Sequence, residues 1–188
     1  MRRRNRWVLV ISIWTFFLAI IFSFVAHLML DRIHSIVVSF LILLVVIFIG
    51  IIFDLVGTSA AAADIAPLNA KAARRVEGAK RGVYLLKNAE QVSNFCNDVA
   101  GDISGIISGT LVTVIVFKLV ATTSYEQAEF YLGIALVALV AALTVGGKAW
   151  GKIIAINHST EVILMVGKII TRLTQPFGLL KDKDHYSG

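Results

Sequence analysis

Four long apolar stretches, separated by short polar segments, dominate the pattern of hydrophobic and polar positions along the chain. They cover residues 7–30, 36–56, 94–121 and 129–145. A helix needs about 17 to 25 predominantly apolar residues to cross the hydrocarbon core of a bilayer, and every stretch reaches that length. We therefore predict an all-α integral membrane protein with four transmembrane helices.

The first stretch also has the order of charge and hydrophobicity found in a signal peptide, with basic residues followed by an apolar segment. Residues 7–30 are too long for the apolar core of a signal peptide, and no small-residue cleavage site follows them. We expect this segment to be retained as an additional span in front of a three-span core.

The polar segments between the stretches predict shorter helices at the membrane surface. Within residues 64–91, apolar side chains recur at helical spacing at Val76, Ala79, Val83 and Leu86. This spacing predicts an amphipathic helix, and Pro67 with Asn69 indicates an interruption before it, so we predict two short interfacial helices. Gly146-Gly147-Lys148 is expected to end the fourth span, and residues 149–173 are then a separate amphipathic juxtamembrane helix on the inner surface.

Lys and Arg are concentrated in three segments, residues 1–6, 64–91 and 148–188, whereas the other connecting segments hold few of them. Cytoplasmic loops of membrane proteins carry an excess of these residues. We therefore predict a multi-pass protein of the plasma membrane with both termini in the cytoplasm. The same distribution accounts for the net charge of +6, so we expect the lipid bilayer as a partner and no nucleic acid.

Composition and motifs narrow the function classes. The chain is 57% hydrophobic, and its single cysteine, Cys96, excludes an internal disulfide and a cysteine-cluster metal site. It has no nucleophile elbow, phosphate-binding loop or pair of metal-ligating histidines. An intramembrane hydrolase built on Asp98 and Asp102 is disfavoured, because both lie on one helix. We do not expect an enzyme.

The candidate chemistry lies where the second stretch ends and the third begins. A charged side chain at membrane depth costs about 2.5–3.5 kcal/mol on insertion scales, so an intramembrane carboxylate indicates a function. The carboxylate, amide and hydroxyl side chains at this junction are Asp54, Thr58, Ser59, Asn97, Asp98 and Asp102. Such oxygen ligands suit Mg²⁺, Ca²⁺ or Mn²⁺, and we predict that these six residues form a cation site.

Structural interpretations of the same residues stand beside this one. Asp98 and Asp102 could bond to hydroxyl groups of a neighbouring helix, and Asn97 could cap the third span. The stripe Gly101-Gly105-Gly109 is typical of close helix packing. Lys148 could neutralise a carboxylate and replace the cation.

Two patterns in this order resemble the membrane domain of the CNNM/CorC magnesium-transport family. The first is the basic segment 78–88 followed by Asn97-Asp98, and the second is the run from Gly147 to Glu161. The resemblance covers residues 34–175 and implies a homodimer that exports Mg²⁺ against Na⁺ entry. It also implies that the ion is held by oxygens of the Gly57-Thr58-Ser59 turn and of Asn97-Asp98.

The chain also departs from the family pattern. Lys148 stands where the family has Glu, and Gly151 stands where it has Pro. The family's nucleotide-binding domains are not found here, and residues 1–33 and 176–188 are read as an added span and a polar cytoplasmic tail. We therefore expect either a Mg²⁺-transport domain or a non-transporting membrane module that serves a separate membrane or cytoplasmic protein as partner or regulatory subunit.

The predicted topology can be tested with introduced cysteines. A cysteine at Ser124 should react with an impermeant reagent from outside the cell, because the segment between the third and fourth spans is predicted to be external. A cysteine at Ser187 should react only after the membrane is opened. Labelling of both positions from the same side would contradict the scheme.

Overall fold

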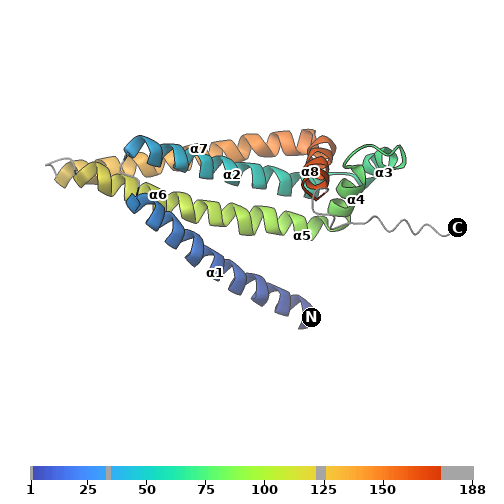
Figure 1. Ribbon diagram of the computed structural model, residues 1–188, viewed down its shortest axis with the longest axis horizontal. Helices are drawn as coiled ribbons and strands as arrows, with labels where there is room; N and C mark the ends of the chain where they lie inside the picture. Colours follow the sequence, from blue (N-terminus) through green and yellow to red (C-terminus); the bar gives the residue numbers. More distant parts are fainter. Residues whose placement is uncertain (1, 33–34, 122–125, 175–188) are drawn as a thin grey trace.

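The computed structural model describes residues 2–32, 35–121 and 126–174, which form helices joined by short turns without any strand (Figure 1). The long helices are α1 (Arg2–Arg32), α2 (Ile36–Ala62), α6 (Gly101–Ala121) and α7 (Glu126–Asn157). The shorter ones are α3 (Ile65–Ala73), α4 (Ala79–Lys87), α5 (Ala89–Asn94), the π-helical turn η1 (Phe95–Ala100) and α8 (Ser159–Thr174). The predicted all-α class is confirmed for the described residues.

Three helical segments are long and apolar enough to cross a membrane, namely Ile36–Ala62, Ala89–Leu119 and Tyr131–Asn157. They correspond to the second, third and fourth predicted spans, so the expectation of a membrane protein with transmembrane helices is confirmed. The first predicted span is also helical, but the apolar segment found in its described part, Ser12–Val25, is shorter than the other three. A fourth span therefore stays a prediction.

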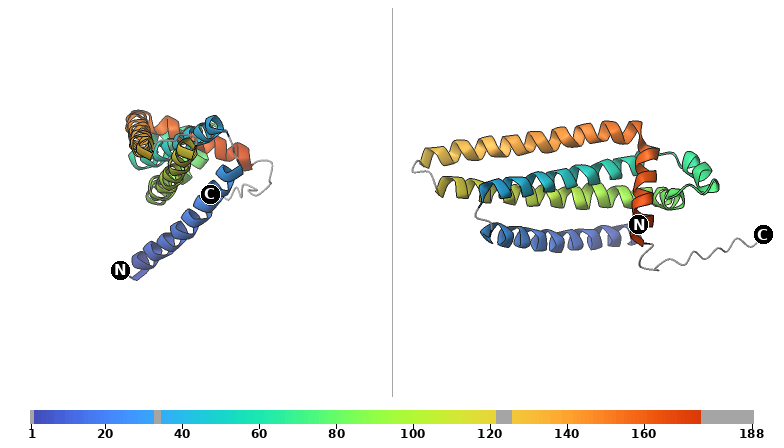
Figure 2. Two further views of the ribbon diagram at one scale, coloured as in Figure 1. Left: turned by 90° about the vertical axis from the view of Figure 1, so that its left-hand side faces the viewer. Right: turned by 45° about the horizontal axis from the view of Figure 1, so that its top comes forward.

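Helices α2, α6 and α7 pack against one another as a bundle, and α1 lies against α6 and diverges from the bundle towards its own N-terminus (Figure 2). The buried core of the bundle consists of Leu43, Ile47, Leu111, Val112, Ile115, Leu136 and Val140. An apolar groove of about 530 Å³ is lined by residues of α1, α2, η1 and α6. Large apolar side chains such as Phe48, Ile134 and Val145 are exposed on the outer surface. This exposure suits a membrane, because the lipid tails are as apolar as these side chains.

The third span is one continuous rod made of α5, η1 and α6. Its middle turn, η1, is wound more widely than an α-helix. Such π-turns insert an extra residue into the helical register and often occur at functional sites. Asn97 and Asp98 both lie within this turn, where Asn97 is half-buried and Asp98 is exposed.

The fourth span ends later than predicted. The expectation that Gly146-Gly147-Lys148 terminates it is wrong, because α7 continues through both glycines to Asn157 and the chain turns only at His158. Gly147 allows close packing here, since a methyl group at that position would collide with the Ile51 side chain. The separate amphipathic helix is therefore α8 alone, and residues 149–157 belong to α7.

Helices α3, α4 and α8 form a small layer across one end of the bundle, which we call the end layer (Figures 1 and 2). Its core contains Ala60, Leu68, Leu86 and Ile163. Helix α8 crosses α4 where the Gly78 carbonyl meets Gly167, and Gly78 adopts a left-handed conformation with φ of 82° that suits glycine. The two short helices predicted within residues 64–91 are present as α3 and α4. The interruption expected at Pro67 and Asn69 is wrong, because both residues lie inside α3 and the break falls at residues 74–78.

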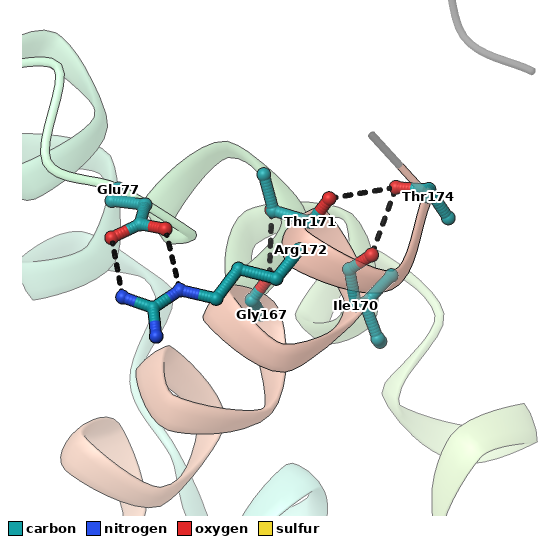
Figure 3. Close-up of polar contacts among 6 residues, drawn as sticks. All are labelled: Glu77, Gly167, Ile170, Thr171, Arg172 and Thr174. Carbon is teal, nitrogen blue, oxygen red and sulfur yellow. Dashed lines mark hydrogen bonds and ion pairs between the residues drawn. The ribbon is translucent and has the colours of Figure 1, made fainter. Parts of the chain in front are cut away.

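An ion pair joins the turn before α4 to the end of α8 (Figure 3). Arg172 donates from Nε to Glu77 Oε1 at 3.0 Å and from Nη2 to Oε2 at 3.3 Å. These hydrogen bonds and the positive charge of Arg172 lower the pKa of Glu77. Both side chains are exposed, so the pair orients α8 more than it stabilises the fold.

Candidate cation site

One face of α2 turns a carboxylate towards the interior of the bundle. Gly50, Asp54 and Gly57 recur at spacings of four and three residues and therefore share that face. All three are buried, and Asp54 is only 5% exposed. Since the α2 backbone presents no side chain at the two glycines, the third span can approach it closely on both sides of Asp54.

The approach is tightest between Gly57 and Asn97 of η1. A methyl group at Gly57 would collide with Asn97 Oδ1 and would lie 2.9 Å from Cys96 Cβ. The Asn97 amide Nδ2 donates to Ser93 Oγ at 3.2 Å, which orients the side chain so that Oδ1 faces α2. Within the described residues this buried oxygen accepts no hydrogen bond.

Helix α7 brings two lysines to the same junction. Lys152 Nζ lies 4.0 Å from Asp54 Oδ2, which is close enough for charge attraction but too long for a hydrogen bond. Lys148 reaches the third span, because a methyl group at Gly101 would lie 3.5 Å from its Nζ. Both ammonium groups therefore approach the contact of α2 with the third span.

Three buried side-chain oxygens have no hydrogen-bond partner among the described residues. They are Asp54 Oδ2 on α2, Asn97 Oδ1 on η1 and Thr144 Oγ1 on α7. Buried polar atoms in native proteins are almost always satisfied by protein, water or an ion, so each of these oxygens requires an explanation. All three are hard oxygen donors of the type that binds Mg²⁺ or Ca²⁺.

Carboxylates do not gather at the junction. No group of three or more His, Cys, Asp or Glu side chains with metal-binding geometry occurs within residues 2–32, 35–121 and 126–174. A cation held here would therefore have Asp54 as its one carboxylate ligand and would rely on amide, hydroxyl, backbone or water oxygens for the rest. Such a donor set fits a hard cation and disfavours a soft metal, which prefers thiolate or imidazole.

The structure separates the six predicted ligands into two groups. Asp54 and Asn97 are directed into the junction, and Ser59 is buried beside it. The Ser59 hydroxyl donates to Leu55 O at 2.8 Å and also lies 3.5 Å from Ala155 O, so it links α2 to α7. Thr58 is half-buried.

Asp98 and Asp102 are on a different face from these residues. Both side chains are exposed, and the structure does not bring them together with Asp54 and Asn97. The three glycines of the stripe Gly101-Gly105-Gly109 also differ in their surroundings. Gly101 faces Lys148, whereas Gly105 and Gly109 are exposed and have open space around them.

Neither Thr144 nor Lys152 was among the residues that the sequence predicted for the site. A signal was present for Thr144, which lies one helical turn before Lys148 and interrupts a run of Ala, Leu and Val. Lys152 could not be assigned, because the span was expected to end at Gly146-Gly147-Lys148. The continuous α7 places Lys152 on the same rigid helix as Thr144.

No protein-family model matches the chain, and neither does any curated protein or solved structure. The likeness to the CNNM/CorC family therefore rests only on the residue patterns quoted for it, and membership of that family stays a prediction.

The close contact at Gly57 predicts the effect of a single added methyl group. Gly57→Ala should destabilise the protein by about 1–3 kcal/mol, the usual range for overpacking, because the new side chain collides with Asn97. Gly146→Ala is the matched control, since nothing lies within 4 Å of the position. Thermal unfolding in detergent would measure both variants, and equal shifts would show that α2 and η1 do not touch here.

Proposed function

We propose that the protein is a transport domain for a divalent cation, with Mg²⁺ as the preferred ion. The ion would bind between α2 and η1, where Asp54 and Asn97 each have a buried side-chain oxygen with no hydrogen-bond partner among the described residues. Asn97 Oδ1 lies against Gly57, about one turn of α2 beyond Asp54. This pair of unpartnered oxygens is the observation that carries the proposal. A bound cation would satisfy both of them and neutralise the buried carboxylate.

The small number of protein ligands favours Mg²⁺ over Ca²⁺. Mg²⁺ prefers octahedral coordination and usually keeps several of its waters, so one carboxylate and one or two further oxygens are sufficient. Ca²⁺ takes about six to eight oxygen ligands, which these side chains do not supply. Backbone oxygens near Gly57 and the Thr58 and Ser59 hydroxyls are available as further ligands. Na⁺ as the coupling ion is an expectation from the family resemblance.

The packing on either side of the site supports a one-sided access route. Towards the far end of the bundle, the buried cluster around Leu43, Ile47 and Leu111 fills the interior with apolar side chains. Buried hydroxyls of Ser104 and Ser108 continue the polar face of α6 in that direction, but both already donate to backbone carbonyls, at 2.8 and 2.9 Å. A cation would therefore enter from the end-layer side and leave only after the apolar cluster rearranges.

We further propose the orientation and the assembly. In our proposal α1 is a fourth span in the plasma membrane, both termini are cytoplasmic, and the end layer faces the cytoplasm. The proposed assembly is a homodimer that forms through the exposed face of α6, which carries Asp102, Gly105, Gly109 and Thr113. A second copy would shield the carboxylate from lipid, and the glycines would let the backbones approach.

A second candidate function is a non-transporting membrane module that acts as a partner or regulatory subunit. The observation that favours it is Lys152 Nζ at 4.0 Å from Asp54 Oδ2. A lysine in this position can neutralise the carboxylate permanently, and the protein would then need no cation for its stability.

Binding of Mg²⁺ should stabilise the purified protein against heat. Saturation at about 100 times the dissociation constant corresponds to roughly 2.7 kcal/mol. Asp54→Asn and Asn97→Ala should abolish the Mg²⁺-dependent shift. The first variant removes the negative charge of the carboxylate ligand, and the second removes the amide oxygen. Asp102→Asn and Glu161→Gln are matched controls on exposed faces and should retain it. If millimolar Mg²⁺ never stabilises the wild type, the transport function is excluded and the module remains.

Replacement of Gly105 by Leu should weaken dimer formation, because the bulky side chain would hold the two α6 helices apart. Since the described residues place no neighbouring atom within 4 Å of a Cβ built at Gly105, folding of the single chain should be unaffected. Gly146→Leu, in the same open surroundings on α7, should leave the dimer intact. The mass of the detergent-solubilised protein and cross-linking in lipid would report assembly. A wild type that is monomeric in both would rule out the dimer.

A further inference from the structure

Lys152 occupies an unusual position between a buried carboxylate and water. Its Nζ lies 4.0 Å from Asp54 Oδ2, and its side chain is 54% exposed whereas that of Asp54 is 7% exposed. The neighbouring residue, Gly151, explains how Lys152 comes so close to a buried side chain of α2. Because Gly151 is buried with Ile51 Cγ2 and Leu55 Cβ at 3.5 and 3.7 Å from where its own Cβ would be, the backbone of α7 lies directly against α2.

We propose that the ammonium group of Lys152 competes with the cation for Asp54. It thereby sets both the affinity of the site for the cation and the release of the cation. The proposal rests on the cation site proposed above and adds the residue that regulates it. At 4.0 Å the ammonium offsets the charge of Asp54 but forms no hydrogen bond, which leaves Oδ2 available as a ligand. A lysine has a flexible stem, and this one can swing into water without unfolding any helix.

Cation binding and the lysine contact exclude each other. A divalent ion at Asp54 Oδ2 would stand within a few ångströms of Lys152 Nζ in a poorly screened environment, and the two positive charges would repel. Entry of the ion therefore drives Lys152 outwards, and return of Lys152 helps to expel the ion. With the ion gone, the lysine supplies the charge that a buried Asp54 requires, so the empty site can persist in the membrane.

Lys148 does not share this role. Its Nζ faces Gly101 of the third span, and no ion pair joins it to Asp54 in the described part of the chain. The competitor is thus one particular lysine, defined by its distance to Oδ2 and by its access to water.

The test is a Mg²⁺ titration of the thermal unfolding of the full chain in detergent, at an ionic strength held constant with tetramethylammonium chloride. If the ammonium group of Lys152 lies at Asp54 in about nine molecules out of ten, only about one in ten can bind the ion. Lys152→Gln should then lower the half-saturating Mg²⁺ concentration about tenfold. Lys152→Arg retains the charge and should not lower it. Lys87→Gln, an exposed lysine at the end of α4, is the control for a general change in charge.

The outcomes separate this proposal from the cation site itself. If Mg²⁺ stabilises the wild type and Lys152→Gln has the same half-saturating concentration, competition by Lys152 is overturned and the site stands. Stabilisation of Lys152→Gln alone would show that the lysine replaces the cation permanently in the wild type, which overturns the exchange and leaves the non-transporting module. If Mg²⁺ stabilises neither, the cation site and the competitor are both overturned.

A second measurement needs no variant and applies if Lys152→Gln does not fold. The wild-type protein is treated with an amine-acylating reagent with and without Mg²⁺, and modification of each lysine is measured by mass spectrometry. Mg²⁺ should increase the modification of Lys152, whose amine is released from Asp54, and should leave Lys87 unchanged. Unchanged or reduced modification of Lys152 would overturn the proposal.

Discussion

The burial of Asp54 is the constraint on which the rest of the bundle depends. A carboxylate inside a spanning helix must be kept from lipid and must be offset by a charge or by hydrogen-bond donors. The bundle meets the first requirement by packing, since glycines on both sides of Asp54 let the third span close over it. It meets the second incompletely, because the nearest charge, on Lys152, stands at 4.0 Å and donates no hydrogen bond. This incomplete compensation is what makes the junction a candidate for function.

Close contact of backbones also organises the parts away from Asp54. Helix α7 stays straight past its glycines and lies against α2, and α8 crosses α4 where Gly167 meets Gly78. Helices in lipid gain little from apolar side chains alone, because the surrounding tails are just as apolar, so small residues that allow close approach give specific packing. The end layer and the bundle are therefore held by the same type of contact, and α8 is placed at the end of the helix that carries Lys152.

The proposed ion site and the proposed dimer contact use different faces of the third span. One face presents Asn97 to α2, and another carries Asp102, Gly105 and Gly109, which the described part of the chain leaves exposed. The first face suits an ion and the second suits another helix. An arrangement of this kind would connect dimer formation to the geometry of the site, because both faces belong to one rigid rod.

The sequence by itself determined the helical class, three of the spans and the presence of the two short helices, because apolar length and local spacing are properties of a segment alone. It also located Asp54 and Asn97 as candidates, since polar residues are conspicuous in apolar runs. Tertiary structure decided which polar residues meet. In a spanning helix the side that faces lipid is as apolar as the side that faces protein, so hydrophobic periodicity does not orient the helix. The packing of η1 on α2 turns Asn97 inwards and leaves Asp98 exposed, and the continuation of α7 to Asn157 brings Lys152 to Asp54.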